Sequence, residues 1–127
     1  MHNHGKKKIL AVVDDLLFTV KISDAAKRAG FDAEFVKSEK DVMDKAAHDK
    51  PLLIILDLNN NSVEPLPLIS KLKDDGDLKN ISIIGYLSHV QGELKQKAHE
   101  AGANIVMARS AFSQNLQQIL KRHAGVR

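Results

Sequence analysis

Three aspartates are the residues of this chain whose types and positions best suit chemistry. Asp57 follows the apolar run PLLIIL at residues 51–56, and Asp14 and Asp15 follow a second apolar run at residues 9–13. Such runs are typical of strands buried on both faces of a parallel sheet, and open α/β sheets bind ligands at the carboxyl ends of their strands. Three carboxylates at one edge repel one another unless a divalent cation or a shared proton relieves the charge. The pattern therefore predicts an acidic pocket suited to a divalent cation.

The elements that must position these aspartates are five strand-like runs alternating with five helix-like segments. Strands are expected at residues 8–13, 32–36, 52–57, 81–87 and 104–108, and helices at 16–29, from 38, at 66–74, at 93–101 and from about 113. Ser38 is a suitable N-cap, Gly30 and Gly102 are suitable helix ends, and Leu17 and Val20 are among the apolar positions of the first helix. This alternation predicts a doubly wound α/β domain with a parallel sheet.

The composition is that of one globular domain. The 127 residues are 43% hydrophobic and 28% charged, which is ordinary for a folded protein with a proper core. No apolar run approaches the roughly 20 residues that span a bilayer, and the amino terminus lacks the apolar segment of a signal peptide. Because the chain also has no cysteine, we expect a cytoplasmic protein. A single domain over residues 1–127 is expected, with residues 1–7 as a flexible tail.

Basic residues gather at the two ends of the chain. The formal charge is +3, the run at residues 6–8 is all lysine, and Lys121, Arg122 and Arg127 lie near the other end. Aromatic residues make up only 4% of the chain, which leaves little for base stacking. We therefore expect neither a nucleic acid nor a membrane as a partner.

Three motifs together point to a known family. VVDD at residues 12–15, IILD at 54–57 and AGA at 101–103 resemble the motifs of a response-regulator receiver domain, the phospho-accepting module of two-component signalling. The resemblance covers about residues 8–120. It implies the flavodoxin-like fold with a five-stranded sheet in the order 2-1-3-4-5. It also implies a signalling protein rather than an enzyme.

The resemblance assigns roles to the acidic residues. Asp57 would accept a phosphoryl group from a histidine kinase or a small phosphodonor. Asp14, Asp15 and Asp57, with the backbone carbonyl of Asn59, would hold Mg²⁺. The cation is needed because a carboxylate that approaches an anionic phosphoryl group is repelled, and a hard cation with oxygen ligands relieves that repulsion.

Several positions that the family uses to sense the phosphoryl group are replaced. The hydroxyl residue after the fourth strand corresponds to Leu87 in an alignment without gaps, whereas a shift of one residue would place Ser88 there. The family's lysine at the end of the fifth strand corresponds to Arg109, whose guanidinium keeps the charge but is larger and planar. The proline after that lysine corresponds to Ser110, and the switch aromatic corresponds to Val106.

The loop after Asp57 departs from the family as well. Asn61 and Pro65 stand where a proline and a glycine are usual, and Pro65 cannot adopt the positive φ that glycine permits. The chain therefore resembles the atypical or pseudo-receiver branch, in which the acidic pocket is retained while the residues that read it are altered.

The same residues have structural interpretations. Asp57 could cap a helix or pair with Arg109, and Asp14 or Asp15 could cap the helix that starts near Leu16. An ion pair of Arg109 with the acids would neutralise them permanently.

Tyr86 and His89 lie at or just beyond the end of the expected fourth strand. Tyr86, the only tyrosine, is expected to fill packing space beside a helix. A metal-dependent hydrolase built from the three acids and His89 is a weaker hypothesis, because no nucleophile–base pair with recognisable spacing accompanies them.

The sequence thus predicts a stand-alone receiver-like regulator that retains Asp57 and the acidic pocket but has degenerate switch residues. With no output domain expected after the last helix, it would act through contact with a downstream protein, at a face within residues 93–120. The alternative is a receiver fold that is not phosphorylated and serves as a constitutive interaction module.

Overall fold

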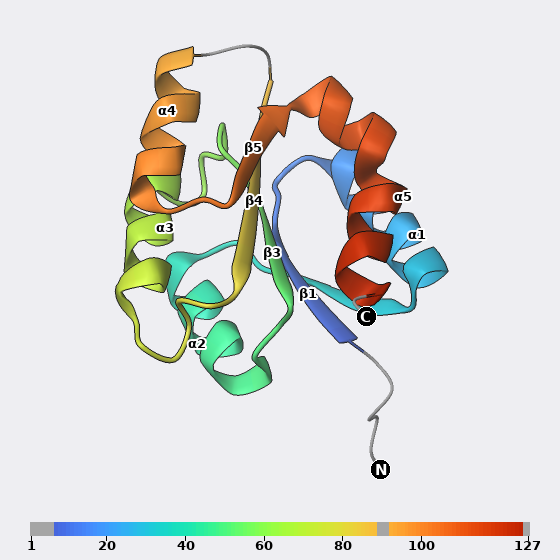
Figure 1. Ribbon diagram of the computed structural model, residues 1–127, viewed down its shortest axis with the longest axis horizontal. Helices are drawn as coiled ribbons and strands as arrows, with labels where there is room; N and C mark the ends of the chain where they lie inside the picture. The colour runs from blue at the N-terminus through green and yellow to red at the C-terminus, as the bar shows by residue number, and fades with distance from the viewer. Residues whose placement is uncertain (1–6, 89–91, 126–127) are drawn as a thin grey trace.

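Strands and helices alternate along residues 7–88 and 92–125, the part of the chain that the computed structural model describes (Figure 1). The elements are β1 (Lys7–Val12), α1 (Leu16–Ala29), β2 (Phe31–Phe35), α2 (Glu39–Asp49), β3 (Leu53–Asp57), α3 (Pro65–Asp74), β4 (Ser82–Leu87), α4 (Gly92–Ala101), β5 (Ile105–Ala108) and α5 (Arg109–Gly125). The strands are all parallel and lie in the order β2-β1-β3-β4-β5. The predicted doubly wound sheet and its strand order are confirmed.

The sheet separates two apolar cores. Helices α1 and α5 cover one face, and α2, α3 and α4 cover the other (Figure 1). Along β3, which is buried throughout, Leu53 and Ile55 belong to the α1/α5 core while Ile54 and Leu56 belong to the opposite core. Because side chains alternate along a strand, Asp57 continues the first series and emerges on the α1/α5 face at the carboxyl edge.

The helix ends follow the local signals in the sequence. Ser38 has extended backbone, and its Oγ accepts a hydrogen bond from the Asp41 N–H at 3.1 Å at the start of α2. Gly30 and Gly102 follow α1 and α4 with φ values of 83° and 122°, a region that glycine enters without steric cost. These three predicted caps are confirmed.

Most element boundaries differ from the prediction by one residue, and two of the differences have an identifiable consequence or cause. β1 includes Lys7, which pairs with Phe31, although the sequence placed Lys7 in the amino-terminal tail; the rest of that tail, residues 1–6, lies outside the described residues. α5 begins at Arg109 instead of near Ser113. The reason is that Phe112 is fully buried in the α1/α5 core, so the segment between β5 and the predicted start packs as the first turn of the helix.

Part of the apolar surface of α1 faces solvent. Leu17 and Val20 are 60% and 59% exposed, and Leu16 is 77% exposed. The buried positions of α1 include Phe18 and Ile22, which face the sheet. None of the helices in the described ranges has the length and apolar character needed to cross a membrane.

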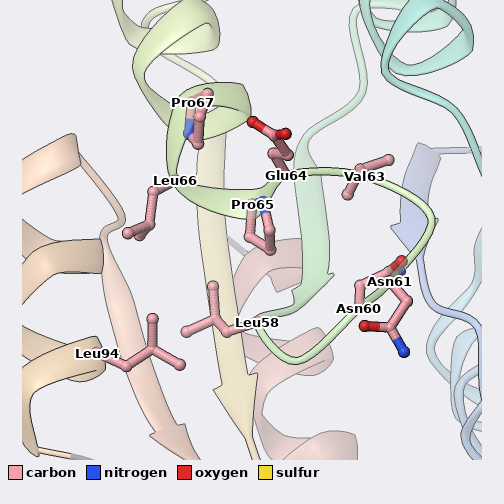
Figure 2. A pocket seen from close by; sticks show the side chains of 9 residues that line it. All are labelled: Leu58, Asn60, Asn61, Val63, Glu64, Pro65, Leu66, Pro67 and Leu94. Atoms are coloured by element: carbon pink, nitrogen blue, oxygen red, sulfur yellow. The ribbon is translucent and has the colours of Figure 1, made fainter.

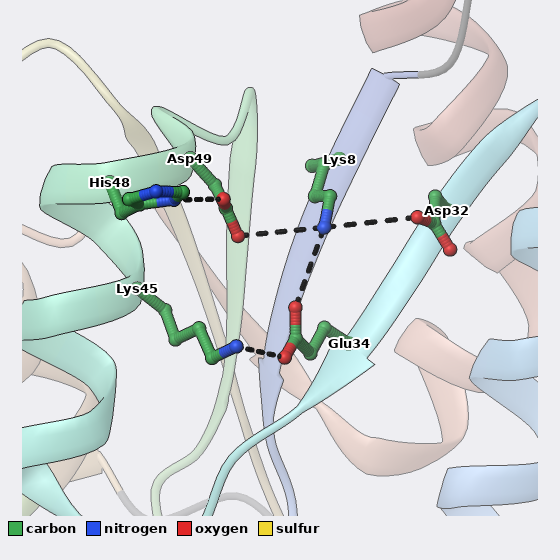
Figure 3. A network of polar contacts seen from close by, with 6 residues as sticks. All are labelled: Lys8, Asp32, Glu34, Lys45, His48 and Asp49. Atoms are coloured by element: carbon green, nitrogen blue, oxygen red, sulfur yellow. Dashed lines mark hydrogen bonds and ion pairs between the residues drawn. The ribbon is translucent and has the colours of Figure 1, made fainter. Parts of the chain in front are cut away.

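An ion-pair network joins the start of β1 with β2 and with the carboxyl-terminal half of α2 (Figure 3). Lys8 Nζ lies 3.5 Å from carboxylate oxygens of both Glu34 and Asp49. Glu34 also binds Lys45 at 2.6 Å, and His48 Nδ1 lies 2.9 Å from Asp49 Oδ1. The network ties α2 to β1 and β2 at the edge of the sheet opposite the three aspartates.

Candidate functional site at the carboxyl edge of the sheet

Asp57 closes β3 and is buried, with 6% of the residue exposed. Its Oδ1 accepts a hydrogen bond from the Asn59 N–H at 2.9 Å. Burial raises the pKa of Asp57; the Asn59 N–H and the charge of Arg109 oppose this increase, whereas Asp15 and Asp14 reinforce it. Asp57 is therefore a desolvated carboxylate with anionic neighbours, an arrangement in which a bound cation is favourable.

Asp14 and Asp15 lie in the turn between β1 and α1. Asp15 is the N-cap of α1, where its Oδ1 accepts a hydrogen bond from the Leu17 N–H at 2.8 Å, so the capping interpretation is confirmed for Asp15. Asp14 Oδ2 instead accepts a hydrogen bond from the Ser62 hydroxyl at 3.1 Å. Both carboxylates act electrostatically on Asp57, so all three acids share the carboxyl edge of the sheet.

The three acids do not form a ready-made metal cluster. Within residues 7–88 and 92–125, no group of three or more histidine, aspartate or glutamate side chains is arranged to hold a metal ion. The reason is visible in the contacts: the Asp15 carboxylate caps α1, and the Asp14 carboxylate is held by Ser62. The donor chemistry nevertheless fits Mg²⁺, because Asp14, Asp15, Asp57 and the Asn59 carbonyl offer only oxygen ligands.

A buried asparagine fixes the loop after Asp57, and sequence reasoning missed it. Asn60 is 7% exposed. Its Nδ2 donates to the Val12 carbonyl at 3.2 Å, and its Oδ1 accepts from the Ser62 N–H. The signal that could have revealed it is the run of short polar residues directly after a buried strand, because such side chains often bond to nearby backbone.

The two candidates for the switch hydroxyl position are Leu87 and Ser88. Leu87 is buried in a core, and Ser88 is exposed. Leu87 ends β4, is 2% exposed and packs in the α2/α3/α4 core, which also contains Val106. Ser88 is exposed, and its N–H donates to Asn59 Oδ1 at 2.7 Å. Since the Asn59 N–H also binds Asp57, Ser88 is connected through Asn59 to the acidic pocket.

Arg109 begins α5 and its guanidinium packs on an aromatic ring. The guanidinium carbon lies 5.4 Å from the centroid of the Phe18 ring, a cation–π contact. No ion pair among the described residues includes Arg109. The hypothesis that Arg109 forms a neutralising ion pair with the acids is therefore wrong, although its charge acts on Asp57 through space.

Tyr86 packs beside helices, as expected from the sequence. It is fully buried and stacks on Phe18 of α1 and Phe112 of α5, with ring centroids 5.0 Å and 4.8 Å away. Its hydroxyl, however, has no hydrogen-bond partner among the residues that the structure describes. His89, which the hydrolase hypothesis requires, lies outside the described residues.

A hollow lies beside Asn60 and Asn61, and none of the three aspartates lines it. It has a volume of about 410 Å³, and its lining residues come from the loop after β3, the start of α3 and Leu94 of α4. Figure 2 shows Leu58, Leu66 and Leu94 on one side and Asn60 and Asn61 on the other. Pro65 starts α3 at a position where a missing N–H costs nothing, which explains how the loop accommodates proline in place of glycine.

Known response regulators match nearly the whole chain. No family model matches it. The polar-differentiation response regulator DivK of Brucella anthropi is 20% identical over 119 residues, which is 94% of this chain and 97% of the relative. The crystal structure of a response regulator from Hahella chejuensis superposes with a TM-score of 0.83 at 21% identity, covering 94% of this chain and 96% of that one.

Two further similar structures were solved in liganded or modified states. The Mn²⁺-bound form of response regulator Rcp1 has a TM-score of 0.74 at 18% identity, with 91% of this chain and 89% of that chain covered. The phosphorylated cyanobacterial phytochrome response regulator RcpA has a TM-score of 0.77 at 22% identity, with the same two shares of 91% and 89%.

The strand order and these similarities show that the chain has the fold of the response regulators, with three acids at the carboxyl edge of its sheet.

Proposed function

We propose that this chain is a single-domain response regulator in which Asp57 accepts a phosphoryl group with the help of Mg²⁺. The observation that carries the proposal is the state of Asp57: a buried carboxylate with a raised pKa, bound by one backbone N–H and flanked by two further acids. A carboxylate that is poorly solvated is a better nucleophile than one in water. The phosphorylated RcpA and Mn²⁺-bound Rcp1 structures support the same chemistry in related folds.

The transfer itself needs few groups. A carboxylate oxygen of Asp57 forms a bond to phosphorus while the bond from phosphorus to the donor breaks, and the donor leaves with the electron pair. From a histidine kinase, the partner we propose in the cell, the broken bond is P–N; from a small acyl phosphate it is P–O. Mg²⁺, when bound, neutralises charge on the transferring oxygens. Asp14, Asp15, Asp57 and the Asn59 carbonyl would hold it.

We further propose that the usual readout is degenerate in this domain. Leu87 and Val106 are apolar and lie in one buried core, so neither can follow the phosphoryl group with a polar contact. Of the two candidates for the missing hydroxyl, Ser88 is the better placed, because Asn59 connects it to Asp57. Output would pass through contact of α4, β5 and α5, within residues 93–120, with a downstream protein in the cytoplasm. On α4 only Ala98 is buried, which leaves most of that helix available to a partner.

The alternative is a constitutive interaction module that is not phosphorylated. The observation that favours it is that two acids already have structural roles, Asp15 as the cap of α1 and Asp14 as the partner of Ser62. Under this alternative, the acids stabilise the loops at the edge of the sheet and no metal is required.

Intact-mass measurement separates the two functions. The protein is incubated with acetyl phosphate or phosphoramidate and Mg²⁺, with EDTA and Asp57→Asn as controls. We expect a mass gain of one phosphoryl unit that is absent in both controls. No gain, together with no measurable Mg²⁺ binding, would establish the constitutive module. Arg109→Lys tests whether the bulky guanidinium slows entry: faster labelling than in the wild type would show that it does.

A further inference from the structure

Three aromatic rings and one guanidinium form a cluster beside Asp57. The aromatic cluster consists of Phe18 from α1, Tyr86 from β4 and Phe112 from α5, with Arg109 over the Phe18 ring. The rings are nearly parallel, at interplanar angles of 14° to 27°. These elements meet on the face of the sheet that α1 and α5 cover (Figure 1). The cluster therefore holds the Tyr86 ring in one orientation.

Tyr86 and Asp57 are neighbours on this face. They are register partners in the pairing of β3 with β4. Tyr86 belongs to the α1/α5 core, and Asp57 continues the β3 series that faces the same core. The charges of Asp57, Arg109 and Asp15 all act on the Tyr86 hydroxyl. The hydroxyl thus lies within electrostatic reach of the candidate phosphoryl site.

Two buried polar atoms of the cluster have no hydrogen-bond partner in the described part of the chain. Tyr86 Oη and Arg109 Nε are both buried, and neither makes a hydrogen bond. Unpaired buried donors are rare because they cost free energy, and those that occur call for an explanation such as a ligand. Burial also raises the pKa of Tyr86, so the hydroxyl keeps its proton and can donate. An arginine Nε–H can only donate.

We propose that the Tyr86 hydroxyl, together with Arg109, donates a hydrogen bond to the phosphoryl group on Asp57, supplying the contact that Leu87 cannot make. Two donors that are unpaired before phosphorylation gain an anionic acceptor afterwards. Leu87 is excluded from this role because it is apolar and packs in the opposite core. This inference rests on the proposed phosphorylation of Asp57 and deepens it by naming the residue that binds the product.

The chain offers a direct optical readout of the inference. Tyr86 is its only tyrosine and there is no tryptophan, so intrinsic fluorescence reports on this hydroxyl alone. A new hydrogen bond to an anion changes the emission of the phenol. We expect the emission of the wild-type protein to change as the phosphoryl mass appears, with both signals following one time course.

The matched variant is Tyr86→Phe, which keeps the ring and removes only the hydroxyl. Two rates are measured, that of phosphorylation of Asp57 and that of loss of the phosphoryl group. We expect at least one of them to differ about tenfold from the wild type, because a hydrogen bond to a charged group is lost. Thermal stability should be unchanged or higher, since an unpaired polar atom is removed. Phe31→Leu, in the same core but outside the aromatic cluster, controls for core damage: it should lower the melting temperature and leave both rates within about threefold of the wild type.

The outcomes are distinct. If the wild type is labelled but its emission is constant and Tyr86→Phe has wild-type rates, Tyr86 has no role and the proposed function stands. If Phe31→Leu reproduces the kinetic effect of Tyr86→Phe, the effect comes from packing and the inference is overturned. If the wild type takes no label, both the inference and the proposed function fail.

Discussion

Ionised Asp57 has a free-energy cost in the folded protein, because burial removes its carboxylate from water. Its pKa is raised in the folded protein, chiefly by desolvation. A folded-state pKa above the unfolded value means that ionised Asp57 opposes folding above that folded pKa. The cost disappears once the pH falls below the unfolded value of about 3.9, where the side chain is protonated in both states.

Asp57→Asn should therefore stabilise the domain near neutral pH. We expect a gain of about 1 kcal/mol in the free energy of unfolding, because the amide can still accept the Asn59 hydrogen bond and carries no charge. Denaturant unfolding at several pH values measures it, and the difference from the wild type should vanish below about pH 4. A variant less stable than the wild type at neutral pH would show that burial does not dominate at Asp57.

At the scale of elements, Asp15 at the amino-terminal end of α1 has both a structural and an electrostatic role. Asp15 caps the helix through the Leu17 N–H and also contributes charge to the acidic pocket. Asparagine is as good an N-cap as aspartate, whereas alanine is not. The two substitutions therefore separate the structural role from the electrostatic one.

Without metal, Asp15→Ala should lower the free energy of unfolding by about 1 kcal/mol, and Asp15→Asn should leave it nearly unchanged. With Mg²⁺ at tenfold its dissociation constant, the wild type should gain about 1.4 kcal/mol, and both variants should gain less. Thermal melts with and without Mg²⁺ provide the comparison. A wild-type gain retained in Asp15→Asn would remove Asp15 from the metal ligands.

The sequence predicts those features that adjacent residues determine, and it does not predict those that depend on contacts between distant segments. The strands and the acids at their ends could be predicted from apolar runs that end in Asp57 or Asp15, because such runs need no tertiary information. The strand order was expected only from the resemblance to receiver domains. The start of α5 at Arg109 could not be predicted, because it depends on Phe112 being buried against α1. The contacts of Asn60 were missed for a similar reason: they cross from the loop to β1.

The roles of single side chains in the site were harder to predict than their positions. Leu87 and Tyr86 are consecutive residues whose side chains enter opposite cores. Sequence comparison assigns a switch role by position along the strand and does not consider the neighbouring residue on the other face. The unpaired Tyr86 hydroxyl becomes visible only once the packing of Phe18 and Phe112 is known.

At the scale of the whole molecule, the acids at the two edges of the sheet differ in their charge partners. Within residues 7–88 and 92–125, Asp14, Asp15 and Asp57 at the carboxyl edge take part in no ion pair, whereas Glu34 and Asp49 are paired with Lys8 (Figure 3). The pKa of Asp49 is lowered, first by its hydrogen bond with His48 and then, against the effect of burial, by Lys8. Lowering the pH should therefore weaken the ion pairs of Asp49 at the amino-terminal edge and remove the cost of ionised Asp57 at the carboxyl edge.

Asp49→Asn should destabilise the domain near neutral pH by about 1 kcal/mol, the opposite sign from Asp57→Asn. A lowered folded-state pKa contributes stability that is fully present above the unfolded value of about 3.9 and is lost as the pH falls through the folded value. The deficit of the variant should accordingly shrink below about pH 4. A deficit that is the same at all pH values would show that it arises from packing and not from charge.

The central claim is that Asp57 becomes an acyl phosphate, and the position of the label tests it most directly. After incubation with acetyl phosphate and Mg²⁺, borohydride reduction converts a phosphorylated aspartate into homoserine, which peptide mass mapping locates. The account predicts homoserine at position 57, its absence when Mg²⁺ is removed, and none at Asp14 or Asp15. Reduction at another aspartate, or no homoserine in a sample that gained phosphoryl mass, would contradict it.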